Sequence, residues 1–248
     1  MWDICEPGLA EFRANGWKLV VVSEPSERRS RPAENAGVVD PGPNPTGWVR
    51  LLSCRDGLVG ASARIRLPDV ELPPLSEVFV RGDEIHFLFP ATATCPIGME
   101  LVLLGIEADE NHLLVESTIS INTSLLDSSP QVELRVGGGH PGKPNWDNTP
   151  WSVLANLADV HWWAASSRQP GLGPAVMTQL CCDRRDLHSL DQRGSATDRG
   201  LCFFGDFLEK GVIRRIRPWW LWSNQRVARD VAERVSLALR DRPLPLGS

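Results

Sequence analysis

Tyrosine is absent from this chain of 248 residues, and lysine is scarce. Of the 26 basic residues only Lys18, Lys143 and Lys210 are lysines, so arginine carries nearly all of the positive charge. The absence of tyrosine excludes any mechanism that depends on a phenol. Buried aromatic volume must come from 10 tryptophans and 7 phenylalanines, and each buried indole N–H then needs a hydrogen-bond acceptor.

Long apolar segments are also missing. No uninterrupted apolar run approaches the ~18 residues that a membrane-spanning helix needs. Residues 1–7 lack the basic and apolar regions of a signal peptide. The six cysteines are scattered, so we expect reduced thiols in a cytoplasmic protein without a membrane partner. A net charge of -5 differs from the basic excess of nucleic-acid-binding proteins, and we expect no nucleic-acid partner.

Alternating apolar and polar residues predict antiparallel strands in the first half of the chain. Every second residue from 59 to 67 is apolar, as in a strand with one face on the core and the other in water. Residues 78–89 predict a hairpin with Gly82 and Asp83 in the turn. Further strands are expected at residues 17–23, 48–53, 101–108, 113–121 and 132–136.

Other patterns predict helices. A proline at the start and Asn15-Gly16 at the end predict a short helix over residues 7–14. Thr149 is placed to cap a helix that runs to about Ser166, and residues 174–182 are a further helical candidate.

The C-terminal pattern is the clearest in the chain. Ser223 is expected to cap a helix that ends before Pro243, and an apolar stripe recurs at every fourth residue, namely Val227, Val231, Val235 and Leu239. We expect this helix to pack on the core near Trp219–Trp222. Residues 201–222 predict a hairpin around Glu209-Lys210-Gly211, whose second strand would bury one face and leave Trp219 on the other.

These elements together predict a mainly β fold, either an antiparallel β-sandwich or a barrel-like domain with C-terminal helices packed on it. An α+β fold is the alternative. Residues 1–137 would form the antiparallel β domain, and residues 138–248 a mixed α/β region packed on the same domain. Residues 24–46 are rich in Pro, Gly, Ser and Arg and are expected to form a flexible loop.

A glycine-rich segment at residues 137–144 matches the GxxxxGK spacing of a phosphate-binding loop. The next position of such a loop needs Ser or Thr to hold magnesium, but here it is Pro144. Pro141 and Pro144 also lack the backbone N–H groups that bind phosphate. We therefore interpret the segment as a connector and expect no nucleotide or other cofactor.

Soft metal ligands gather in one region, at Cys181, Cys182, His188 and Cys202. Adjacent cysteines lack the CxxC spacing that lets two ligands reach one zinc ion from a turn. Cysteine is also common as a small core residue. We therefore expect no metal site, with these four residues as the candidates if one exists.

Catalytic signatures are not evident. No GxSxG elbow occurs, and no Ser/His/Asp order stands out. His161 falls on the apolar stripe of the predicted helix, where a histidine is more often a core residue than a base. The candidates for catalysis are His161, Asp159 and His140.

Tryptophan beside short polar residues is the most unusual feature, at Trp146, Asp147, Trp151, Asn156 and Trp163. Flat aromatic rings next to Asp or Asn suit a sugar ring or a protein interface, although they could equally fill the joint between sheet and helix. We predict a non-catalytic module that binds a protein partner or a carbohydrate-like ligand through this Trp-rich surface. The alternative is a hydrolase or transferase whose His and Asp residues converge only in the fold.

Overall fold

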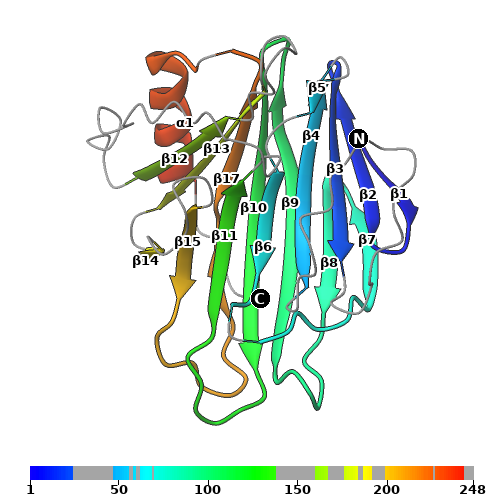
Figure 1. Ribbon diagram of the computed structural model, residues 1–248, viewed down its shortest axis with the longest axis vertical. Coiled ribbons are helices and arrows are strands. Elements are labelled where there is room, and N and C mark those ends of the chain that lie inside the picture. The colour runs from blue at the N-terminus through cyan, green and yellow to red at the C-terminus, as the bar shows by residue number, and fades with distance from the viewer. Residues whose placement is uncertain are drawn as a thin grey trace, which may run out of the picture.

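The structure is a computed structural model that describes residues 1–24, 47–55, 58–59, 62–68, 70–137, 160–166, 176–183, 187–191, 199–225 and 227–242. These residues form two antiparallel β-sheets packed face to face, with one helix on the outside of one sheet (Figure 1). The described strands leave both sheets open at their edges, as in a sandwich. The predicted mainly β sandwich with a C-terminal helix is confirmed.

The nine-stranded sheet contains the N-terminal strands. Its order is β1 (Trp2–Glu6), β2 (Leu9–Ala14), β3 (Trp17–Glu24), β4 (Trp48–Arg55), β6 (Ser62–Arg66), β11 (Gln131–Gly137), β15 (Arg199–Phe204) and β14 (Leu187–Asp191), with β5 (Leu58–Val59) also paired to β4. The strands predicted at 17–23, 48–53 and 132–136 are confirmed, and the one predicted at 59–67 is divided into β5 and β6. Residues 25–46, which contain most of the predicted flexible loop, lie outside the described residues.

The eight-stranded sheet contains the long central hairpin. Its order is β12 (Val160–Ser166), β13 (Met177–Asp183), β17 (Trp219–Ser223), β10 (His112–Thr123), β9 (Ile97–Ala108), β8 (Glu84–Phe89) and β7 (Glu77–Arg81), with β16 (Arg214–Ile216) also paired to β10. The predicted turn between β7 and β8 is confirmed, because Arg81 lies opposite Glu84 and Gly82 has a positive φ of 61°.

Alternating side chains from both sheets form one core. Leu19 and Ile65 of the first sheet pack in the same cluster as Phe87 and Leu103 of the second, and all four are 0% exposed. Trp220 also belongs to this cluster, and its indole N–H donates a hydrogen bond of 2.9 Å to Ser117. The period of two residues thus explains the sandwich, since each strand presents one apolar face to the opposite sheet.

The helix predicted at residues 7–14 is wrong, because this segment is the strand β2. Asn15 and Gly16 have positive φ values of 47° and 80° and form the tight turn between β2 and β3. An Asn-Gly pair favours both a helix end and a hairpin turn, and the pairing of β2 with β3 selects the turn.

Two further helix predictions are wrong. The last seven residues of the helix predicted at 149–166 are the strand β12, and the earlier ones lie outside the described residues. The helical candidate at 174–182 largely coincides with β13. These strands pair with each other, and β13 pairs with β17, so sheet formation overrides the local helical pattern.

The hairpin predicted for residues 201–222 is also wrong. The strand β15 belongs to the nine-stranded sheet, whereas β16 and β17 belong to the eight-stranded sheet. The sequence also predicted that only one face of the second strand is buried, and this prediction is wrong. All five residues of β17 are buried, because Trp220 and Trp222 face the core while Trp219 and Leu221 face the helix.

The C-terminal helix α1 (Arg229–Asp241) packs where the sequence indicated. Val227, Val235 and Leu239 share a buried cluster with Trp219 and Leu221. Its predicted cap is wrong, since the proposed capping serine is the last residue of β17 and the helix begins six residues later. All six cysteines are free. The described part of the chain contains no helix that is both long and apolar enough to cross a membrane.

Candidate functional site

The Trp-rich surface predicted from the sequence remains a prediction. His161 and Trp163 have backbone positions in β12, opposite Cys182 and Leu180, and His188 lies in β14. The other predicted residues lie outside the described residues, and these are His140, Trp146, Asp147, Trp151, Asn156 and Asp159.

The cysteine candidates for a metal site are separated by the fold. Cys181 packs on the helix side of β13, whereas Cys182 packs between the sheets, and Cys202 lies in the other sheet. Burial raises the pKa of the Cys181 thiol well above its ordinary value, which disfavours the thiolate that a metal would need. Within the described ranges no three His, Cys, Asp or Glu residues are grouped closely enough to hold a metal ion.

A row of arginines crosses the outer face of the nine-stranded sheet. Arg50 in β4 lies opposite Arg64 in β6, and Arg64 lies opposite Arg135 in β11. Directly opposed residues of antiparallel strands have Cβ atoms about 4.5–5.5 Å apart, a separation at which like charges repel. The fold therefore gathers three guanidinium groups in a protein whose net charge is -5.

Three further residues complete this group. Glu133 lies opposite Arg66 and forms ion pairs with both Arg66 and Arg135. The guanidinium carbons of Arg66 and Arg64 lie 4.8 Å and 5.4 Å from the centre of the Trp48 ring, within the range of cation–π attraction. We use the name arginine face for Arg50, Arg64, Arg66, Arg135, Glu133 and Trp48.

Little of the arginine face is open to water. The side chain of Glu133 is 1% exposed, and those of Arg135 and Arg66 are 15% and 21% exposed. Attraction between opposite charges is stronger in such partly desolvated places than in bulk water. Among the described residues, the face places four guanidinium groups beside one carboxylate, and guanidinium groups bind carboxylate and phosphate through paired N–H donors.

Sequence reasoning missed this site. The alternation of residues 59–67 placed Arg64 and Arg66 on the polar face of a strand, where arginine is expected. Arg50 and Arg135 come from strands distant in sequence, and only strand order and register bring them alongside. The one available signal was arginine at polar positions of three predicted strands in a chain nearly without lysine.

The outer face of the eight-stranded sheet, here named the acidic face, carries carboxylates paired with basic or ionisable side chains. The ring of His86 lies between two carboxylates, with Nδ1 3.2 Å from Glu100 and Nε2 3.4 Å from Glu84. Phe79 stacks on the same ring, with the centroids 4.6 Å apart. Each carboxylate here is close to a cationic or ionisable partner, which is typical of a structural surface network.

Glu116 fastens α1 to this face. It accepts a hydrogen bond of 3.0 Å from the Trp219 indole and forms an ion pair of 2.9 Å with Arg242, just beyond the end of the helix. Burial raises the pKa of the Glu116 carboxyl, although the charges of Arg242 and Arg217 act in the opposite direction. The contact therefore joins β10, β17 and the C-terminal end of α1.

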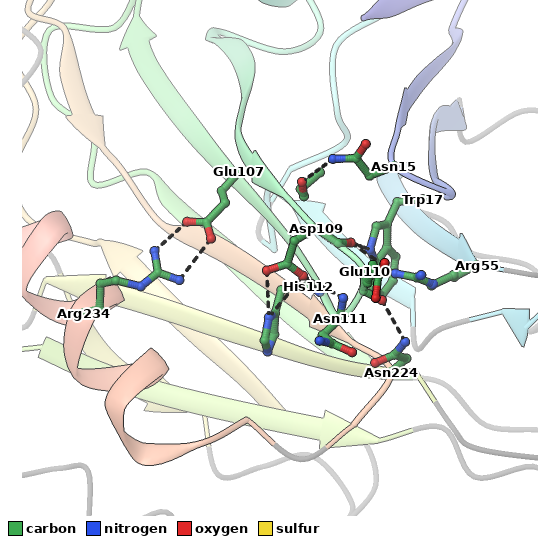
Figure 2. Close-up of polar contacts among 11 residues, drawn as sticks. Asn15, Trp17, Arg55, Glu107, Asp109, Glu110, Asn111, His112, Asn224 and Arg234 are labelled. Carbon is green, nitrogen blue, oxygen red and sulfur yellow. Dashed lines mark hydrogen bonds and ion pairs between the residues drawn. The ribbon is translucent and has the colours of Figure 1, made fainter.

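The turn between β9 and β10 organises a polar network (Figure 2). One carboxylate oxygen of Asp109 accepts the backbone N–H groups of Asn111 and His112 at 2.6 Å and 2.7 Å, and it lies 3.4 Å from Nδ1 of His112. The Asp109 carbonyl accepts hydrogen bonds from Trp17 and Arg55. Partial burial acts to raise the pKa of Asp109, but the two N–H groups and the neighbouring imidazole lower it below its ordinary value.

Comparison with known proteins gives little further information. No known family matches the chain, and no curated protein matches its sequence. A solved structure described as a heparinase III gene product is similar with a TM-score of 0.44 and 9% sequence identity, over 89% of this chain and 35% of that chain. This chain thus spans about a third of that protein, and a similarity of this extent supports no conclusion about activity.

Proposed function

We propose that this protein binds an anionic carbohydrate-like ligand on the arginine face. The observation that carries the proposal is the cross-strand row of Arg50, Arg64 and Arg135. Guanidinium groups bind carboxylate and sulfate through paired N–H donors, and three of them on rigid strands would fix the orientation of an acidic sugar. Trp48 adds support, because cation–π contacts hold two of the guanidinium planes against its ring.

A small ligand fits this face better than a partner protein does. A stable protein interface buries about 800 Å² on each partner. The arginine face exposes little area, since Arg50 is 8% exposed and Trp48 is 6% exposed. A binding role also fits Glu133 better than catalysis does, because both of its oxygens are held by arginines and neither is placed as a base.

The Trp-rich residues belong to the same proposal. Trp146 and Trp151 would supply aromatic surface for the apolar face of a sugar ring, and Asp147 and Asn156 would bind its hydroxyl groups, whereas Trp163 belongs to β12 of the opposite sheet. Trp151→Ala should then weaken binding of the same ligand whose binding Arg64→Ala weakens.

The test is a calorimetric titration of the full chain with oligogalacturonate and dextran sulfate, with neutral dextran as the control. We expect the charged saccharides to bind, with affinity that falls as salt rises. Arg64→Ala should weaken binding about 10-fold or more, as expected for the loss of one charge-assisted contact of about 1.5–3 kcal/mol.

Arg81→Ala is the matched control, because Arg81 is an exposed arginine in the eight-stranded sheet. It should leave the affinity unchanged. An equal loss in both variants would overturn the proposal, as would the absence of binding. Equal affinity for polyglutamate would also overturn it, since the face would then bind any polyanion rather than a carbohydrate-like ligand.

A further inference from the structure

Three buried polar side chains on the outer face of the eight-stranded sheet have unsatisfied hydrogen-bonding atoms. Nε2 of His112, Oγ of Ser223 and both amide atoms of Gln179 have no hydrogen-bond partner in the described part of the chain. His112 is 8% exposed, and Ser223 and Gln179 are 0% exposed. Buried polar groups are nearly always hydrogen-bonded. Three unpaired ones on the same face therefore indicate a site with a role other than stabilising the fold.

Strand register places the three side chains on one face of neighbouring strands, although Nε2 of His112 and Oγ of Ser223 are not hydrogen-bonded to each other. His112 in β10 lies directly opposite Ser223 in β17. Gln179 in β13 lies opposite Leu221, so it is the diagonal neighbour of Ser223 on the same face. Cβ atoms are about 4.5–5.5 Å apart in directly opposed pairs, and diagonal neighbours are about 7–8 Å apart, within reach of a long side chain.

Asp109 orients the imidazole. Figure 2 shows its carboxylate beside the ring of His112, on the side of the turn where Arg234 of α1 reaches Glu107. The Nδ1 atom faces Asp109 at 3.4 Å, and the carboxylate is itself anchored by two backbone N–H groups. A proton on Nδ1 satisfies this contact and leaves the Nε2 lone pair available as a base.

We propose that Asp109, His112 and Ser223 form a hydrolytic site for small carboxylic esters, with the Gln179 amide as donor to the oxyanion. The Ser223 oxygen attacks the ester carbonyl carbon while Nε2 of His112 takes the hydroxyl proton. The carbonyl oxygen becomes an oxyanion and accepts a hydrogen bond from the Gln179 amide. The ester C–O bond then breaks, and the alcohol leaves with the proton from His112.

Water completes the cycle. It attacks the acyl carbon and gives one proton to His112, and the bond from that carbon to the Ser223 oxygen breaks. Ser223 recovers its proton from His112, and the carboxylic acid is released. No oxidant, reductant or metal is needed for either half of the reaction.

Access to the serine requires α1 to move. The helix side chains Val235 and Leu239 pack on Trp219 and Leu221, which occupy the same face of β17 as Ser223. The first turn of α1 has no side-chain cap hydrogen bond at Ala228, so its N-terminal end is not fastened in that way. The site therefore suits small esters and slow turnover. It lies on the opposite sheet from the arginine face and does not depend on ligand binding there.

The experiment uses the full chain with p-nitrophenyl acetate and, separately, a fluorophosphonate probe. We expect a burst of p-nitrophenol followed by slow turnover, and mass spectrometry should locate the probe on Ser223. Ser223→Ala and His112→Ala should abolish both signals, and Asp109→Asn should lower the rate at least 100-fold. Hydrolysis no faster than in buffer, or a probe attached elsewhere, would overturn the proposal.

Ser53→Ala is the matched control. Ser53 is also 0% exposed and also lacks a hydrogen-bond partner in the described part of the chain, but it lies in β4 of the other sheet. Its variant should keep full activity, and a loss equal to that of Ser223→Ala would contradict the assignment. Val235→Ala loosens the packing of α1 and should speed probe attachment several-fold, whereas unchanged or slower labelling would overturn the role of the helix.

Discussion

The two outer faces of the sandwich differ in how their described charges are arranged, although the two inner faces are alike. On the nine-stranded sheet, Arg50, Arg64 and Arg135 stand side by side, and Glu133 pairs with Arg135. On the eight-stranded sheet, described carboxylates contact basic side chains, as in the pairs of His86 with Glu100 and of Arg242 with Glu116.

This difference concerns how the described charges are paired on each face. Opposite charges in close contact contribute to stability or are neutral to it, so these ion pairs of the acidic face have a structural role. Like charges placed directly opposite each other in a sheet cost stability. Proteins commonly retain local conflicts at sites that bind ligands, and the row of Arg50, Arg64 and Arg135 is the feature on which the proposed binding rests.

The largest expected effect is on the helix-covered half of the acidic face. Val235→Asp would bury an unpaired charge against Trp219 and Leu221, and should lower the free energy of unfolding by several kcal/mol, enough to unfold a marginal domain. Chemical denaturation measures this change. Leu237→Asp is the control on the same helix, because Leu237 is 45% exposed and its substitution should change stability by less than about 0.5 kcal/mol.

The opposite result would change the interpretation of α1. If Val235→Asp melted at the wild-type temperature, the apolar stripe would not be anchored to the sheet. The helix would then be a docking surface for another chain, and the polar groups of His112 and Ser223 would not be covered by it.

A medium effect is expected at the arginine face. Glu133→Gln removes the buried carboxylate that pairs with Arg66 and Arg135, so it should destabilise the protein by about 1.5–3 kcal/mol, as for the loss of a hydrogen bond between charged groups. Glu100→Gln, the matched change on the acidic face, should cost about 0–1 kcal/mol because that pair is more exposed. Thermal melts at low and high salt measure both, and equal losses would remove the distinction between the faces.

The smallest expected effect is on the pH dependence of folding stability. The raised pKa of Glu116 contributes stability that is fully present below the ordinary pKa of glutamate and is lost as the pH rises through the folded-state value. Glu116→Gln keeps an acceptor for the Trp219 indole but does not titrate. The melting temperature of this variant, relative to that of the wild type, should therefore rise as the pH is raised from 4 to 7. A change in the opposite direction would show that the ion pair with Arg242 outweighs burial.

The sequence by itself determined the fold class and the elements with unambiguous local signals. The alternation in β6, the turn at Gly82 and the apolar stripe of α1 all specified their structures, because each depends on periodicity or on residues that only one turn accepts.

Tertiary structure decided the rest. It made strands of β2, β12 and β13, whose local patterns also fit helices, because sheet partners supply backbone hydrogen bonds that an isolated segment lacks. Strand order alone set Arg64 between Arg50 and Arg135, and His112 opposite Ser223, although these residues lie far apart in sequence. No local pattern encodes which strands become neighbours, and so neither candidate site could be predicted from the sequence.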